Sequence, residues 1–193
     1  MTFKGTNESG RSMIEMLGVL AIIGVLSVGG IAGYSQAMSK FKVSKTTDQI
    51  QTMVTNIRTL FSGQRDYGGL DGKTAYTMGI LTDETWDGTS ATNAYGGPIL
   101  LNISTDKHKF MITYNGLPQD ACTRMVMSDW GNASSGLVGL NVKGTEQDDA
   151  AAKADPNYTT AAKKVPLSLT DAVSACKGTA TSDNTSSITW VYR

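Results

Sequence analysis

The sequence contains little of what metal centres and nucleic-acid-binding surfaces require. Its 193 residues include one histidine and two cysteines, and no basic run is longer than Lys163-Lys164. One histidine and two cysteines cannot by themselves supply the four ligands of a zinc site. The 17 positive and 17 negative side chains cancel, whereas nucleic-acid binders concentrate positive charge on one face. We therefore expect no metal, no cofactor and no nucleic-acid partner.

Signatures of catalysis are also absent. The sequence has neither a Gly-x-Ser-x-Gly nucleophile turn nor a Gly-x-x-x-x-Gly-Lys phosphate loop. Asp66 and Asp71 flank glycines but lack the alternating oxygen ligands of a calcium loop. His108 stands between two lysines, so we interpret it as a solvated residue. We predict no catalytic residues and expect that the protein is not an enzyme.

A long apolar segment lies near the N-terminus. Residues 16–33 carry no charge, and the first charge after them is Lys40. A helix over residues 16–39 would be about 36 Å long, which exceeds the bilayer core of about 30 Å. The twelve residues at the N-terminus are hydrophilic, and no small-residue cleavage site follows the apolar run. This pattern differs from an ordinary secretory signal and is compatible with a simple membrane anchor.

Glu15 interrupts the apolar segment close to its start. Placing a carboxylate at the centre of a membrane costs about 2.5–3.5 kcal/mol of insertion free energy, and less near an interface. Such a residue therefore usually pairs with another group or has a function. If the chain were cut between Gly10 and Arg11, Glu15 would be the fifth residue of the new N-terminus. The alternative is an interfacial glutamate that faces lipid headgroups.

Residues 10–17 (GRSMIEML) and 19–24 (VLAIIG) resemble the processing site and helix of the type IV prepilin family. The resemblance implies that a membrane peptidase cuts after Gly10 and that the new amine of Arg11 is methylated. It also implies that the apolar helix is retained, first as a membrane anchor and then as the core of a filament. Arg11 departs from the Phe, Met or Leu usual at this position. In a filament, Glu15 could neutralise the buried amine of a neighbouring subunit and fix the register between subunits.

The apolar helix also contains glycines that allow two interpretations. Gly29 and Gly33 form a small-xxx-small pair that would let helices approach closely, although glycine is simply common in membrane helices. Each glycine weakens a helix by about 1 kcal/mol relative to alanine. We predict that the helix bends or melts locally when subunits pack, in the segment that holds Gly24, Gly29, Gly30 and Gly33.

The helical pattern continues beyond the apolar segment. Apolar residues recur at helical spacing with charged residues between them, and Gly63 provides a stop signal. We therefore expect one helix from about Ser12 to Ser62, whose second half is amphipathic and packs against a globular head. The residues of this apolar stripe are Met38, Phe41, Ile50, Met53, Val54, Ile57, Leu60 and Phe61.

The residue pattern of the remaining chain predicts an α+β fold. Residues 64–97 are rich in Gly, Asp, Thr and Asn and predict a loop with at most short helical turns. Short helices are expected after Pro118 and after Thr170, with Thr170 as an N-cap, and residues 145–164 are expected to be exposed. Strands are predicted at Ile99–Ser104, Lys109–Tyr114, Leu137–Val142 and Ser187–Tyr192. The predicted architecture is a helical spine packed on an antiparallel sheet.

Cys122 and Cys176 are the only cysteines. An even number of cysteines beyond a membrane segment suggests one disulfide in an oxidising compartment. Two buried free thiols are the alternative.

Several further segments resemble the type IVb major pilins, and among them the bundlins of bundle-forming pili. These segments are residues 60–64 (LFSGQ), 67–71 (YGGLD), 93–97 (NAYGG), 121–122 (AC), 174–177 (SACK) and 188–192 (ITWVY). The resemblance implies the type IV pilin fold, with a disulfide-bonded region bounded by Cys122 and Cys176 on the filament surface. It divides the chain into a leader (1–10), a transmembrane and filament-core helix (11–39), an amphipathic helical half (40–62) and a head (63–193).

The same resemblance implies a function and partners. The chain would be the major structural subunit of a pilus used for adhesion, aggregation or motility. It would cross the inner membrane once as a prepilin and then enter an extracellular homopolymer. Prepilin peptidase, an assembly ATPase, an inner-membrane platform and an outer-membrane secretin would be its partners. The alternatives are a minor pilin or type II secretion pseudopilin and, in another class, a membrane-anchored binding module or enzyme.

Overall fold

The computed structural model describes residues 8–147, 165–178 and 185–193, with side chains from Met13 onward except that of Ala133. The chain forms two compact units, Met1–Phe41 and Lys42–Arg193. The boundary between them falls inside the first helix, α1 (Glu8–Phe61). Each unit is described by itself below.

Helix α1 has 54 residues. It begins at Glu8, four residues before the predicted start, and it ends at Phe61, one residue before the predicted end. A turn at Ser62 and Gly63 follows, in which Gln64 N–H donates to the Phe61 carbonyl oxygen over 2.9 Å. Residues 24–33 are helical throughout in the single chain. The predicted bend or local melting concerns packed subunits, so it stays a prediction.

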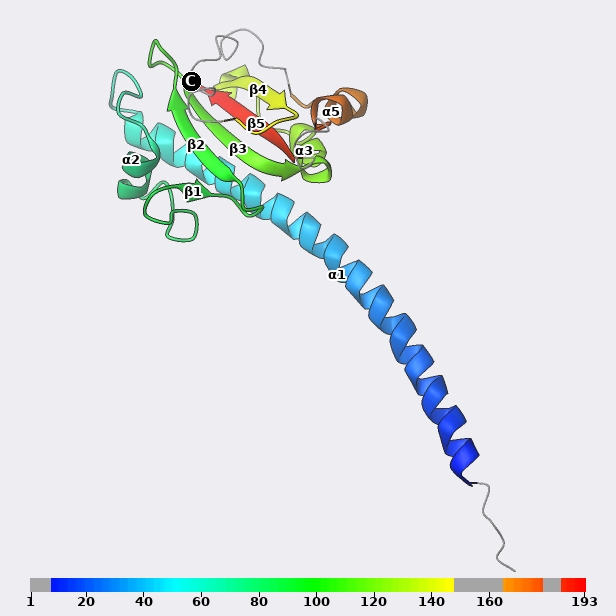
Figure 1. Ribbon diagram of the computed structural model, residues 1–193. Helices are drawn as coiled ribbons and strands as arrows, with labels where there is room; N and C mark the ends of the chain where they lie inside the picture. Colours follow the sequence, from blue (N-terminus) through cyan, green and yellow to red (C-terminus); the bar gives the residue numbers. More distant parts are fainter. Residues whose placement is uncertain (1–7, 148–164, 179–184) are drawn as a thin grey trace, which may run out of the picture. The chain divides into compact units, whose positions relative to one another are not determined.

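The second unit is built on a five-stranded antiparallel sheet of order β1-β2-β3-β5-β4 (Figure 1). The four predicted strands are confirmed, and their bounds are β2 (Pro98–Ile103), β3 (Phe110–Pro118), β4 (Leu137–Lys143) and β5 (Thr185–Tyr192). A two-residue strand, β1 (Ala91–Thr92), lies within the predicted loop. The last strand in the chain, β5, occupies the middle of the sheet between β3 and β4.

One face of the sheet packs with the part of α1 that belongs to the second unit. Ile50 and Ile57 of α1 are fully buried in one core with Ile112 of β3 and Trp190 of β5. Met53, Val54 and Phe61 join the same core, as predicted. The apolar stripe of the helix therefore forms one wall of the head.

Three members of the predicted stripe are not core residues. Met38 is only half-buried and is not part of the core. Phe41 is 61% exposed and Leu60 is 46% exposed. At about 100° per residue, Phe41 lies about 180° around the helix from Ile50, and Leu60 lies about 80° away. Thr46 is instead fully buried, because it lies only about 40° from Ile50, although its hydroxyl group gave no apolar signal.

The opposite face of the sheet is buried as well, but it is partly polar. Met111 and Val191 form a small apolar cluster there. The hydroxyl groups of Thr113 and Thr189, on adjacent strands, are hydrogen-bonded over 2.8 Å. Since buried polar groups need partners, this pairing allows threonine to occupy the centre of a sheet.

Three short α-helices and one 3₁₀ turn complete the described part of the second unit: α2 (Gly72–Thr77), α3 (Gln119–Val126), the turn at Ala133–Ser135, and α5 (Leu169–Ala175). Helices α3 and α5 lie side by side at one end of the sheet (Figure 1). Helix α2 falls in the predicted loop as a short helical turn.

Two local predictions were wrong. The N-cap of α5 is Ser168 and not Thr170, because the helix begins at Leu169 and the Ser168 hydroxyl accepts a hydrogen bond from the Asp171 N–H. Residues 145–164 were expected to be exposed; residues 145 and 146 are exposed, but Gln147 is only 4% exposed. Its backbone N–H donates to the Asn115 side-chain oxygen over 2.9 Å, and its side-chain amide donates to the Ser187 hydroxyl over 3.1 Å. Residues 148–164 lie outside the described part of the chain.

Candidate functional site

The first unit exposes a continuous apolar surface. Every large apolar side chain from Met13 to Tyr34 is at least 52% exposed. Among the described residues, Met13–Phe61 is the one helix long and apolar enough to cross a membrane, with a segment of mean hydropathy 2.2. Apolar patches of this extent mark membrane or protein contacts. This segment is therefore the first candidate site.

The charged and small residues singled out in the sequence all lie within this helix. Gly10 and Arg11 are in its first turn, and Glu15 follows as an exposed residue about one turn later. At the glycines of the helix, an added methyl group would meet no atom within 4 Å: Gly24, Gly29, Gly30 and Gly33. The fold of the single chain therefore does not explain why these positions are glycine.

The predicted disulfide is present. Cys122 of α3 is bonded to Cys176 at the C-cap of α5, and the two Cα atoms are 5.8 Å apart. Both cysteines are fully buried. The Ser186 hydroxyl at the start of β5 donates to the Cys176 carbonyl oxygen over 2.8 Å. The bond thus joins α3 to α5 next to the central strand, and the alternative of two free thiols is wrong.

The turn over residues 93–97 carries a pilin-like motif whose physical basis the sequence did not reveal. The Asn93 side-chain oxygen accepts hydrogen bonds from the Tyr95 and Gly97 backbone N–H groups, over 2.8 and 3.3 Å. The Asn93 amide donates to the Asn115 carbonyl oxygen over 2.7 Å. At Gly97 a Cβ atom would overlap the backbone of Asn115. The motif therefore closes a tight turn directly against β3.

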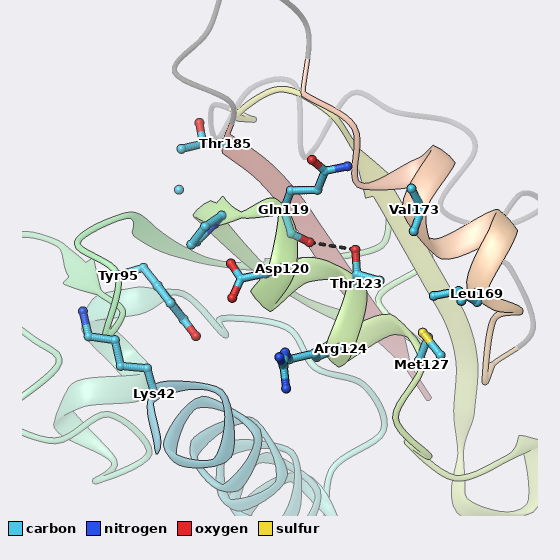
Figure 2. A pocket seen from close by; sticks show the side chains of 12 residues that line it. Lys42, Tyr95, Gln119, Asp120, Thr123, Arg124, Met127, Leu169, Val173 and Thr185 are labelled. Atoms are coloured by element: carbon cyan, nitrogen blue, oxygen red, sulfur yellow. Dashed lines mark hydrogen bonds between the residues drawn. The ribbon is translucent and has the colours of Figure 1, made fainter. Parts of the chain in front are cut away.

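Next to this turn lies a cavity of about 850 Å³ (Figure 2). Its walls include Lys42 of α1, Tyr95 of the turn, Asp120 and Arg124 of α3, and Val173 of α5. The Tyr95 hydroxyl is buried and has no hydrogen-bond partner among the described residues. Burial, and then the charge of Asp120, raise the pKa of Tyr95 to about 12. Sequence reasoning missed this site, whose one local signal was the tyrosine of the 93–97 motif.

The residues considered for metal or acid–base chemistry have structural roles instead. Asp71 is the N-cap of α2 and accepts from the Thr74 N–H over 2.7 Å. Asp66 accepts from the Gly68 N–H over 2.7 Å, and His108 is exposed in the β2–β3 hairpin. Within the described residues, no three His, Cys, Asp or Glu side chains come together in a metal-binding arrangement.

The sequence profile of the bundlin family matches residues 36–193. The chain belongs to the bundlin family. It is similar to the major structural subunit of bundle-forming pilus of Escherichia coli O127:H6 (strain E2348/69 / EPEC), with 26% identity over 190 residues that cover 96% of this chain and 95% of the relative. The corresponding protein of Escherichia coli O111:H- is 25% identical over the same coverage.

A pilus protein of another organism also matches, over a shorter part of the chain. The type IV major fimbrial protein FimA of Dichelobacter nodosus is 30% identical over 147 residues, which cover 74% of this chain and 84% of the relative. The long N-terminal helix, the antiparallel sheet and the Cys122–Cys176 disulfide give this bundlin-family chain the type IV pilin fold. The chain is therefore a structural pilin that polymerises into an extracellular filament, and its relatives support the role of a major pilin.

Proposed function

We propose that this pilin is the major structural subunit of a type IVb-like pilus and that residues 11–39 are its polymerisation helix. The observation that carries the proposal is the exposure of every large apolar side chain from Met13 to Tyr34. Such a surface requires lipid or other protein around it. In the prepilin, a single pass through the inner membrane buries the helix, and in the filament, helices of like subunits bury it.

Processing removes residues 1–10. Prepilin peptidase cuts between Gly10 and Arg11, and the new amine of Arg11 is methylated. A cytoplasmic assembly ATPase, an inner-membrane platform protein and an outer-membrane secretin then move the subunit out of the bilayer. The filament serves adhesion, aggregation or motility. Apolar burial is favourable both in lipid and in the filament core, so work is needed only to extract and shift each subunit.

Glu15 pairs with the α-amine of a neighbouring subunit in the filament core. Removing one member of a buried ion pair costs about 3–5 kcal/mol, because the other charge stays buried without a partner. The pair therefore fixes the axial register between subunits. The glycines at 24, 29, 30 and 33 support close helix packing in the same core, since no atom of the chain itself occupies the space beside them.

Mass spectrometry of filaments sheared from the cell surface tests the processing. We expect the N-terminal peptide to begin at Arg11 and to carry one methyl group, and we expect the pilin to dominate the sheared protein. A filament that retains the decapeptide would contradict the proposed cut, and a trace amount of pilin would indicate a minor subunit.

A glutamate substitution tests the charge pair. Glu15→Ala should abolish filaments while the pilin remains in the inner membrane at the parental level. The matched control is Asp48→Ala, which removes an exposed carboxylate from the same helix and should leave filaments intact. Normal filament yield from Glu15→Ala would refute the pairing.

A further inference from the structure

The described part of the second unit exposes few large apolar side chains, and three of them share one surface. Met127, Leu169 and Val173 are 39%, 60% and 43% exposed and line the cavity beside α3 and α5. Exposed apolar side chains that gather at a cavity are typical of a binding surface. We call this surface the α3/α5 groove, and it is formed by Lys42, Tyr95, Arg124, Met127, Leu169 and Val173.

One end of the α3/α5 groove is apolar, and the other end is cationic. The Lys42 Nζ atom lies 5.5 Å from the centroid of the Tyr95 ring, so a cation–π contact holds the ammonium group at this end. Figure 2 shows Tyr95 between Lys42 on one side and Arg124 on the other. The carboxylate of Asp120 lies in the same wall. Two positive charges and one negative charge leave this end with a net charge of +1.

The Tyr95 hydroxyl indicates what kind of group the cationic end accepts. This hydroxyl is buried and has no hydrogen-bond partner among the described residues, and a buried polar group without a partner is destabilising. Because burial raises the pKa of Tyr95 to about 12, the hydroxyl keeps its proton at neutral pH and can donate it to a hydrogen bond. A donor between two cations fits an anionic oxygen such as that of a phosphate group.

The place of Lys42 in the chain sets the level of the groove when the pilin is anchored in a membrane. Lys42 follows Ser39, the last residue of the uncharged segment, by three positions. Three residues span at most about 11 Å, so Lys42 stays within this distance of Ser39 at any orientation of the second unit. The headgroups occupy about 5–8 Å on each side of the hydrocarbon core. The cationic end of the groove therefore lies at, or immediately above, the headgroup layer.

We propose that the α3/α5 groove binds the headgroup of an anionic phospholipid while the pilin is anchored in the inner membrane. The lipid phosphate lies between Lys42 and Arg124 and accepts a hydrogen bond from the Tyr95 hydroxyl. The apolar side chains of the groove contact the glycerol and upper acyl region of the same lipid. A free anion would leave these side chains in water, whereas a phospholipid joins an anion to an apolar group. This inference rests on the proposed single pass through the inner membrane and adds a contact between the head and the bilayer surface.

Fluorescence quenching in vesicles tests the contact with the full-length chain. Ser174→Cys places a thiol-linked fluorophore on an exposed position of α5 next to Val173. The labelled pilin is reconstituted in phosphatidylcholine vesicles with or without phosphatidylglycerol, and a phospholipid that is spin-labelled on its headgroup serves as quencher. Time-resolved fluorescence then gives the ratio of docked (quenched) to undocked chains. We expect phosphatidylglycerol to raise this ratio about fivefold, the factor that one net positive charge near an anionic surface provides.

A second probe position is the matched control for the quenching. Thr77→Cys carries the same fluorophore on an exposed position of α2, and α2 and α5 lie at opposite sides of the second unit (Figure 1). Its quenching should not increase with phosphatidylglycerol. Peptide mapping verifies that Cys122 and Cys176 remain paired in both labelled chains. An equal docked-to-undocked ratio of the Ser174 probe in the two kinds of vesicle would overturn the proposal.

Substitutions in the groove separate a built site from general attraction to a charged surface. Lys42→Gln and Arg124→Gln should each lower the docked-to-undocked ratio about fivefold in vesicles with phosphatidylglycerol. Tyr95→Phe should lower the ratio as well, although it changes no charge, because it removes the hydrogen-bond donor and keeps the ring. Lys73→Gln, at an exposed position of α2, is the matched control and should leave the ratio unchanged. Unchanged ratios in both cation variants, or in Tyr95→Phe, would overturn the proposal.

Two other occupants of the groove would give different results. Displacement of the docked state by millimolar inorganic phosphate at constant ionic strength would identify a site for a free anion. Docking that appears only when several chains share one vesicle would identify a neighbouring chain as the occupant. Either result would overturn the lipid site.

These outcomes are separable from failure of the proposed function. Chains that stay in the vesicles after alkaline carbonate extraction but show no docked population would refute only the headgroup site. Chains that the extraction releases would refute the single pass through the membrane, on which the proposed function depends.

Discussion

Gly97 illustrates how a single residue without a side chain determines local structure in this pilin. It lies where the 93–97 turn passes against β3, and its backbone N–H donates to the Asn93 side chain. A Cβ atom at this position would overlap the Asn115 carbonyl group, which is backbone and cannot rotate away. Any side chain at this position would therefore force the turn or β3 to shift, and glycine avoids this cost.

Gly97→Ala should consequently lower the free energy of unfolding by about 1–3 kcal/mol, as overpacking of a well-packed site typically does. Urea unfolding of the detergent-solubilised chain, followed by the fluorescence of the buried Trp130 and Trp190, measures this change. Gly63→Ala is the matched control, because no atom lies within 4 Å of an added methyl group there. Equal stability of the two variants would show that the turn relaxes freely.

At the scale of the element, the disulfide holds helices that are too short to be stable alone. Helix α3 has 8 residues and α5 has 7, whereas isolated helices of fewer than about 12–15 residues are marginal in water. The cysteines are separated by 54 positions in the sequence. Closing a loop of this length restricts the unfolded chain, with a stabilising effect of about 4 kcal/mol in the chain-entropy treatment.

The Cys122→Ser/Cys176→Ser variant should therefore lose about 2–4 kcal/mol of unfolding free energy. The same urea titration checks this, and the parent chain unfolded in the presence of a thiol reductant should give a matching curve. If the variant were as stable as the oxidised parent, the covalent link would contribute nothing to the fold.

The glycines in the apolar half of α1 have no packing role within the single chain, so we expect their role in contacts between subunits. Replacing Gly33 by leucine adds a side chain where the single chain has no neighbour. Gly33→Leu should leave the pilin level in the inner membrane unchanged but lower the filament yield about tenfold, because helices can no longer approach closely. Ser27→Leu is the control, because Ser27 lies about 160° around the helix from Gly29 and about 120° from Gly33. Equal yields from the two variants would argue against close packing at the glycines.

On the scale of the whole molecule, charge is divided unevenly along the chain. Residues 11–62 carry five positive and two negative side chains, a net of +3, and residues 63–193 carry eleven and fourteen, a net of −3. If the helical spine and the head of neighbouring subunits attract each other in the filament, salt should weaken the filament. The screening length falls from about 10 Å at 0.1 M to about 3 Å at 1 M ionic strength.

Purified filaments should therefore release more subunits as ionic strength rises, which sedimentation of filaments at graded sodium chloride concentrations can measure. An uncharged osmolyte of matched osmolarity is the control. Filaments that are insensitive to salt would show that this charge division does not contribute to cohesion.

The sequence alone determined the features that depend on local pattern. The apolar helix, the amphipathic stripe through Ile50 and Ile57 and the four main strands follow from the spacing of apolar residues along the chain. The N-cap at Ser168 was missed because Ser168 and Thr170 are equivalent caps in sequence, and only the start of the helix distinguishes them.

Only the tertiary structure decided the features that depend on contacts between distant residues. It places β5 at the centre of the sheet, buries Thr46 and Gln147, and brings Lys42, Tyr95 and Arg124 around one cavity. The spacing of apolar residues along the chain indicates which face of a helix or strand is apolar, but it does not indicate which elements pack against each other. The pairing of strands and the burial of polar groups follow from the packing of the whole chain, in which most buried donors and acceptors are hydrogen-bonded.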